Sequence, residues 1–419
     1  MGKAAEATNS RRVNMARILS LKSAMAEFDP QLTDLVTELN RTAGGGKVAS
    51  ANAPVPSRPE PQPSPEDLAS LDALLQYGVD RGASDVILTA GCGLVLRIQG
   101  ELVKGAEPIY SDQAIRKLIS SLLTPIYREE LERDLTLDFS FIRENIGRFR
   151  ANVHFQRGTM GVAIRVLPRQ VPTLEALRLP KALEKLALRR KGLILVTGSA
   201  GAGKTTTLAA LISLINKSRP CHIVTIEDPI EYRHDNQRAV IEQIEVGRDA
   251  RSFAGALRSI LRQSPDVILL GEIRDNETMA TAITAAETGH LVLATLHTND
   301  AVGAVGRIVD AFGSDQQAQI RQQLSLGLAA VIAQQLIPAS QGNDRFAAVE
   351  ILVANNAVAN LIRRGEDHML RSQLSLGKSD GMVSMEESLA ALVRSRLVDR
   401  ETAAAHTLRP DEFTRYIAR

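Results

Sequence analysis

Residues 198–205 read Gly-Ser-Ala-Gly-Ala-Gly-Lys-Thr, a spacing typical of a loop that binds phosphate. Glycines let the backbone curl around an anion, so that the loop amides and the start of the next helix face the phosphate oxygens. Lys204 would add positive charge beside the terminal phosphates, and the Thr205 hydroxyl suits Mg²⁺. We therefore predict that ATP and Mg²⁺ bind here, and that the nucleotide contacts Gly198, Ser199, Ala200, Gly201, Ala202, Gly203, Lys204, Thr205 and Thr206.

Acidic residues and histidines stand at the ends of three apolar runs, 222–226, 267–270 and 291–296. Because the carboxyl ends of parallel strands share one edge of a sheet, these side chains should meet at the phosphate loop. The predicted Mg²⁺ ligands are Thr205, Glu227, Asp228 and Glu272. The candidates for positioning the attacking water are Glu231 and Glu272, and the sequence leaves that choice open.

Each of these groups also has a plainer explanation when it is taken alone. Glu227 or Asp228 could cap the following helix. His290 and His297, which bracket the third apolar run, could be satisfied by backbone hydrogen bonds. Only the combination with the phosphate loop favours a catalytic role.

The elements that must position these groups alternate along the second half of the chain. Short apolar runs at 193–197, 222–226, 267–270 and 291–296 are separated by helical patterns, which predicts a parallel sheet covered by helices. After about residue 354 the pattern is helical with short loops.

The segment before this sheet predicts a smaller α/β domain. Helices are expected over 68–79, 113–123 and 125–134. Strands are expected over 85–88, 94–98, 101–104, 137–141, 148–156 and 160–167, with hairpin bends at 99–100 and 157–158.

We expect five regions along the chain. Residues 1–42 form an N-terminal extension with at most two short helices, since Pro30 interrupts its apolar spacing. A linker rich in Pro, Gly and Ala follows at 43–65. The remaining regions are the small domain at 66–168, a connector at 169–184 and the larger domain with its C-terminal helices at 185–419.

Composition excludes several classes of protein. The 50 basic and 48 acidic residues leave a net charge of +2, which argues against nucleic acid as a partner. Two cysteines, Cys92 and Cys221, are too few for a zinc cluster or a disulfide framework. No apolar run approaches the ~18 residues of a membrane span, so we expect a cytoplasmic protein.

Four motifs in order resemble those of the secretion-superfamily ATPases. They are 198–205 as Walker A, 225–231 as the aspartate box, 266–275 as an atypical Walker B and 288–299 as the histidine box. The resemblance covers roughly residues 66–400. It implies an α/β fold, in which an N-terminal PAS-like domain precedes a RecA-like P-loop NTPase domain with a helical C-terminal region.

Within this superfamily the chain most resembles the type IV pilus retraction (twitching motility, PilT-type) branch. Shared segments include Gly82–Asp85, Leu96–Gly100, Arg148-Phe-Arg150 and Leu361-Ile-Arg363. One departure is Ala359, where that branch carries an arginine. The resemblance implies a hexameric ATPase motor for pilus retraction at the inner face of the cytoplasmic membrane, with an inner-membrane platform protein as partner.

The same resemblance implies a catalytic set larger than the loop. Arg150 and Arg165 from the first domain, with Arg258 and Arg262 from the second, would reach the terminal phosphate, although each could be a surface ion pair instead. His290 and His297 complete the set. Alternative functions are a pilus-assembly or type II secretion ATPase, a weakly hydrolysing accessory ring subunit, and a DNA motor.

Overall fold

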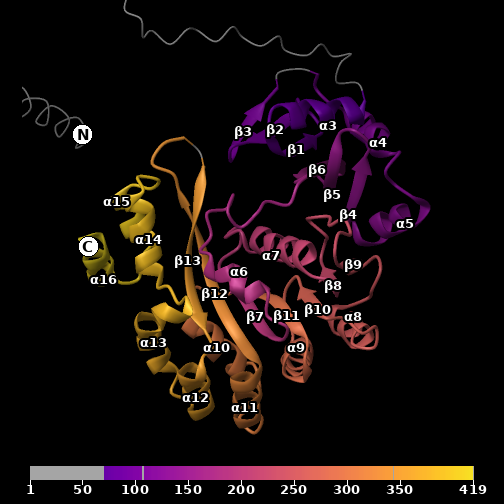
Figure 1. Ribbon diagram of the computed structural model, residues 1–419. Helices are drawn as coiled ribbons and strands as arrows, with labels where there is room; N and C mark the ends of the chain where they lie inside the picture. Colours follow the sequence, from indigo (N-terminus) through magenta and orange to yellow (C-terminus); the bar gives the residue numbers. More distant parts are fainter. Residues whose placement is uncertain (1–69, 106–107, 343, 419) are drawn as a thin grey trace, which may run out of the picture. The chain divides into compact units, whose positions relative to one another are not determined.

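The computed structural model describes residues 70–105, 108–342 and 344–418, all within one compact unit, Pro63–Arg419 (Figure 1). The predictions for the extension at 1–42 and the linker at 43–65 lie outside these described residues. Within the described residues, no helix is both long and apolar enough to cross a membrane.

The first part of the described chain folds into a six-stranded antiparallel sheet in the order β3-β2-β1-β6-β5-β4. Its strands are β1 (Ala83–Thr89), β2 (Val95–Ile98), β3 (Glu101–Lys104), β4 (Thr136–Arg143), β5 (Gly147–Gln156) and β6 (Thr159–Leu167). Its helices are α3 (Leu71–Asp80), α4 (Asp112–Ile119) and α5 (Pro125–Asp134).

Helix α4 is shorter than the predicted span of 113–123. It ends at Ile119, and the Ser120 hydroxyl donates to the carbonyl of Lys117. Serine hydroxyls compete for backbone groups in this way, so a serine pair is a weak continuation of a helix. The spacing of the apolar residues does not reveal this competition, so it predicts a longer helix.

The second part folds into a seven-stranded sheet in the order β13-β12-β7-β11-β10-β8-β9. Every neighbouring pair from β12 to β9 is parallel, and β13 joins the edge in antiparallel direction. The strands are β7 (Gly192–Thr197), β8 (His222–Glu227), β9 (Val240–Glu245), β10 (Val267–Leu270), β11 (Leu291–Leu296), β12 (Leu328–Pro338) and β13 (Arg345–Val353).

The sequence predicts only the central four strands of this sheet. Strand β9 is not predicted because glutamate and glutamine interrupt its apolar residues, so that it shows no continuous apolar run. Strand β12 is not predicted because it follows helix α11 (Gln317–Gly327) directly, with no residue between them to mark where the helix ends. The hairpin β12–β13 is therefore recognised only from the pairing of its strands in the structure.

Helices cover this sheet and continue past it. Those between strands are α6 (Ala182–Ala187), α7 (Lys204–Ser218), α8 (Phe253–Ile260), α9 (Asn276–Thr288), α10 (Ala301–Asp310) and α11. The C-terminal elements are α12 (Asn356–Arg364), η2 (Asp367–Met369), α13 (Leu370–Leu376), η3 (Gly377–Asp380), α14 (Met385–Arg394), α15 (Arg400–Ala405) and α16 (Pro410–Ile417). Figure 1 shows these last elements, in yellow, gathered beside the β12–β13 hairpin.

Each sheet has its own hydrophobic core. The parallel sheet is so apolar that β7, β10 and β11 are buried at every residue. A third, smaller cluster joins Ile337 and Ala348 of the hairpin to Leu389 and Phe413 of the C-terminal helices. Burial of this apolar surface fixes the C-terminal helices against β12 and β13.

Candidate active site

The phosphate loop joins the buried strand β7 to helix α7. Gly198, Gly201 and Gly203 have φ angles of 147°, 76° and 84°, which L side chains rarely adopt. At Gly198 a Cβ atom would also lie 2.4 Å from the carbonyl oxygen of Gln334. The glycine spacing is therefore required by the backbone curl.

Gln334 of β12 holds the loop from behind. It is buried; its Nε2 donates to the Ala202 carbonyl at 2.8 Å, and its Oε1 accepts from Thr207 Oγ1 at 2.8 Å. Sequence reasoning missed this residue because β12 was not predicted. The available signal was the pair of amides, Gln334 and Gln335, within an otherwise apolar run.

Lys204, the first residue of α7, reaches back across the loop. Its Nζ donates to the carbonyls of Gly198 and Ser199 at 2.9 and 3.0 Å. Burial lowers the pKa of this amine. The two bonds hold the lysine charge within the curl of the loop, where phosphate would sit.

A cavity of about 180 Å³ opens beside the start of α7. It brings together most of the residues predicted from the strand ends. Its polar lining includes Lys204, Thr205, Glu227, Asp228, Glu231, Glu272 and His297. The acidic residues and His297 follow parallel strands β8, β10 and β11 at one edge of the sheet, as expected, while Lys204 and Thr205 begin helix α7.

The two carboxylates at the ends of neighbouring strands have different environments. Glu227 is buried and accepts from Thr225 Oγ1 at 2.7 Å and from Gln243 Nε2 at 3.2 Å. Burial raises the pKa of Glu227. Glu272 contacts Arg274, and its Oε2 lies 3.5 Å from His297 Nε2. Glu272 therefore lies beside an arginine and a histidine, whereas the hydrogen-bond partners of Glu227 are neutral.

The two histidines are separated by the fold. His297 lines the cavity, and its pKa is lowered by burial and by the nearby charges of Lys204 and Arg274. His290 lies at the opposite end of β11, and its Nδ1 is 3.0 Å from the Ala285 carbonyl oxygen. The backbone-bonded explanation fits His290, and a catalytic role for it stays a prediction.

The four predicted phosphate-binding arginines do not line the cavity. Arg150 lies 3.5 Å from Asp138, and Arg165 lies 3.0 Å from Asp85. Arg258 pairs with Glu277, and Arg262 is largely exposed at the end of the same helical region. These side chains lie at the protein surface, and their contact with nucleotide stays a prediction.

A fifth arginine touches the predicted site directly. Arg148 of β5 donates to the backbone carbonyls of Ile230 and Glu231 at 2.9 and 3.3 Å. Burial lowers the pKa of this guanidinium. In the sequence it appears only as a neighbour of Arg150, two residues away on the same face of the strand. Arg148 fixes the backbone that carries Glu231.

The cavity suits a metal ion that is bound together with phosphate. All four predicted ligands, Thr205, Glu227, Asp228 and Glu272, line it. Across the described part of the chain, no three acidic, histidine or cysteine side chains gather tightly enough to hold a metal by themselves. Mg²⁺ usually takes one or two protein ligands and completes its shell with water and phosphate oxygens, so this lining fits it.

Comparison with known proteins identifies the family of the chain. The chain matches the family described as Type II/IV secretion system protein over residues 70–401. It is 39% identical over 335 residues to the type IV pilus ATPase PilU of Pseudomonas aeruginosa, covering 80% of this chain and 88% of that one. It is 44% identical over 315 residues to a twitching motility protein of Neisseria gonorrhoeae, covering 75% and 84%.

Solved structures give the same result. The crystal structure of the pilus retraction motor PilT with bound ADP superposes with a TM-score of 0.78 at 41% identity, over 83% of this chain and 99% of that one. The predicted fold class and the predicted enzyme class, an ATPase that binds nucleotide, are confirmed. The chain belongs to the Type II/IV secretion system protein family and lies close to its pilus retraction ATPases.

Proposed function

We propose that this chain is the ATP-hydrolysing motor that powers type IV pilus retraction and twitching motility. The observation that carries the proposal is the meeting of Lys204, Thr205, Glu231 and Glu272 in one cavity at the phosphate loop. The names of the relatives, a retraction ATPase and a twitching motility protein, supply the process that this hydrolysis drives.

The chain's own residues divide the catalytic work. The loop amides and Lys204 bind the phosphates, while Thr205 and Glu272 would hold Mg²⁺, which neutralises charge on the phosphate oxygens when it is bound. Glu231 lines the cavity without a side-chain partner among the described residues, whereas Glu272 is engaged by Arg274 and His297. Glu231 is therefore the better placed of the two to accept the proton of the attacking water.

The phosphate-binding arginines would come from outside the cavity. Arg150 and Arg165 each form an ion pair in which one partner is exposed, Asp138 in the first pair and Arg165 in the second. Solvent-accessible ion pairs contribute only about 0–1 kcal/mol. Such pairs exchange easily for contacts with a terminal phosphate. Together with Arg258 and Arg262, they would act when the first domain closes or when subunits meet in a hexameric ring.

The expected setting follows from this function. A motor that retracts pili works on the inner face of the cytoplasmic membrane, where ATP is present and a membrane platform protein can receive the force. We therefore propose a cytoplasmic hexamer that binds an inner-membrane platform protein and no nucleic acid.

The proposal is tested by deleting the gene and imaging surface pili and twitching. Retraction predicts cells that carry excess pili and do not twitch, with rescue by the wild-type gene and no rescue by a Lys204→Ala gene. Cells without pili would instead indicate an assembly ATPase, and normal pili with a secretion defect would indicate a type II secretion ATPase.

A weakly hydrolysing accessory subunit is a second candidate. It is favoured by Ala359 of helix α12, which stands where the retraction branch is expected to carry an arginine. Purified protein that binds ATP but turns it over near background would support this candidate. Turnover that is abolished by Lys204→Ala would support the motor.

A further inference from the structure

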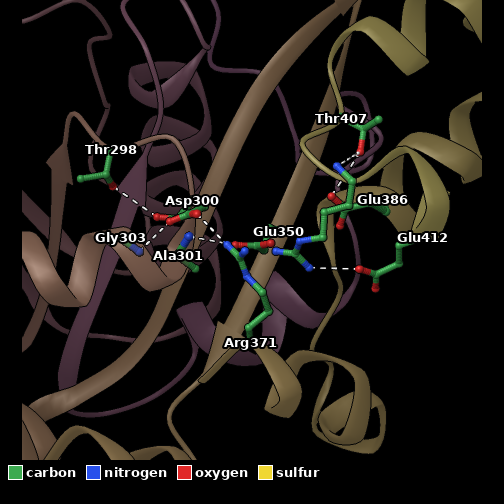
Figure 2. Close-up of polar contacts among 10 residues, drawn as sticks. Thr298, Asp300, Ala301, Gly303, Glu350, Arg371, Glu386, Thr407 and Glu412 are labelled. Atoms are coloured by element: carbon green, nitrogen blue, oxygen red, sulfur yellow. Dashed lines mark hydrogen bonds and ion pairs between the residues drawn. The ribbon is translucent and has the colours of Figure 1, made fainter. Parts of the chain in front are cut away.

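The first turn of helix α10 gathers two carboxylates from distant parts of the chain, as Figure 2 shows. Asp300 caps the helix, since its Oδ1 accepts from the Gly303 amide at 2.6 Å. Glu350 of β13 is buried, and its Oε1 accepts from the Ala301 amide at 2.8 Å. Amides at a helix start have no partner within the helix, so both carboxylates are stabilised there.

One cation balances this concentration of negative charge. Arg371 of α13 donates through Nη2 to Asp300 Oδ2 at 2.8 Å. Burial and the charges of Asp300 and Glu386 raise the pKa of Glu350, while Arg371 lowers it. Arg371 thus joins the C-terminal helices to the start of α10.

The same helix start is tied to the active site by a short piece of chain. Strand β11 ends at Leu296, and helix α10 begins at Ala301; both residues are buried. The four residues between them begin with His297, whose Nε2 lies 3.5 Å from Glu272. Thr298 Oγ1 donates to the Asp300 carbonyl at 3.4 Å within this turn. A segment so short transmits any shift of the helix start to His297.

We propose that Asp300, Glu350 and Arg371 are positioning residues for ATP hydrolysis, which fix the start of α10 and thereby hold His297 against Glu272. None of the three lines the catalytic cavity, so they act through the turn 297–300. The inference rests on the proposed function, because it assigns these residues a role in that same reaction.

The test compares two arginine variants of the full-length chain. Arg371→Gln removes the cation from Asp300. The matched control is Arg321→Gln, which removes an ion pair between α11 and η2. In that pair Arg321 donates two hydrogen bonds of 2.8 Å to Asp367. We expect Arg371→Gln to lower kcat about 10-fold or more, since small misplacements of catalytic groups are costly, with KM and binding of a fluorescent ADP analogue within about 2-fold. Arg321→Gln should leave kcat within about 2-fold.

A double-mutant cycle separates positioning from general stability. In a His297→Ala background, Arg371→Gln should lower kcat by less than about 2-fold, because the group that it positions is gone. Asp300→Asn keeps a helix-capping side chain but loses the ion pair, and it should reproduce the effect of Arg371→Gln. This second variant serves if Arg371→Gln fails to fold.

Equal losses of kcat in the wild-type and His297→Ala backgrounds would overturn the inference. A second result would also overturn it: if Asp300→Asn or Arg371→Gln lost no more kcat for a given fall in Tm than Arg321→Gln does, the loss would reflect stability alone. The wild-type measurement keeps the two proposals apart. A wild-type protein without ATPase activity contradicts the proposed function, whereas an active wild-type protein with fully active variants contradicts only the positioning role.

Discussion

The two sheets of this protein use charged residues in different ways. In the six-stranded antiparallel sheet, Arg150 is half-buried and Arg165 is exposed, and each pairs with a carboxylate of the neighbouring strand. In the seven-stranded sheet, the ends of parallel strands bring Glu231 and Glu272 together at one cavity with Lys204. Antiparallel strands end alternately at opposite edges, whereas parallel strands end at the same edge. The comparison teaches that strand direction concentrates chemistry in one region and disperses it in the other.

The largest effect should come from the phosphate loop of the parallel sheet. Lys204→Ala removes the charge held within the curl, and we expect ATP hydrolysis to fall about 1,000-fold. Lys217→Ala, near the other end of the same helix α7, is the matched control and should keep wild-type activity. Steady-state phosphate release measures both. Residual activity close to that of the wild type in Lys204→Ala would contradict the assignment of this cavity as the active site.

The next effect distinguishes the two carboxylates within the parallel sheet. Glu272→Gln should lower kcat about 100-fold, because a neutral amide holds Mg²⁺ much more weakly than a carboxylate does. Glu227→Gln should lower kcat less than about 10-fold, because its oxygen can still accept from Thr225 and Gln243. Equal losses in the two variants would show that both carboxylates act on the nucleotide.

The arginines of the antiparallel sheet should show a smaller effect. Arg150→Ala and Arg165→Ala are each expected to lower kcat about 10-fold, since two guanidinium groups share the phosphate charge. Arg133→Ala, which removes an exposed arginine of α5 paired with Asp134, is the control and should change little. If both variants match this control, the first domain contributes no catalytic arginine through these two positions.

The last prediction concerns the stability of the fold in acid and involves no catalytic step. Burial lowers the pKa of His234 to about 4, because the charged form is poorly solvated there. His234 binds a proton near pH 6.5 in the unfolded chain and only near pH 4 in the folded chain. Protonation of the unfolded chain therefore leaves the free energy of unfolding unchanged above pH 6.5 and lowers it as the pH falls towards 4. We expect a loss of about 2 kcal/mol, allowing for partial exposure.

Urea unfolding at several pH values measures this loss. The comparison variant is His234→Gln, which cannot titrate, so its unfolding free energy should fall less between pH 6.5 and 4 than that of the wild type. Parallel curves for the two proteins would contradict a neutral His234 in the folded state.

Much of the parallel sheet could be predicted from the sequence. The apolar runs that become β7, β8, β10 and β11 are long enough to indicate buried strands, and the glycine spacing indicates the phosphate loop. Strands β9, β12 and β13 could not be predicted in the same way. Their residues indicate strands only once the neighbouring strand that pairs with each of them is known.

By itself, the sequence determined the phosphate loop and the order of the polar motifs, because glycine φ angles and apolar periodicity are local properties of the chain. The tertiary structure decided which distant residues support the site and the start of α10. Gln334 behind the loop, Arg148 at the backbone of Glu231, and Glu350 at the start of α10 each act on residues at least 49 positions away. Such contacts follow from how strands pair and helices pack, and no short pattern of residues encodes them.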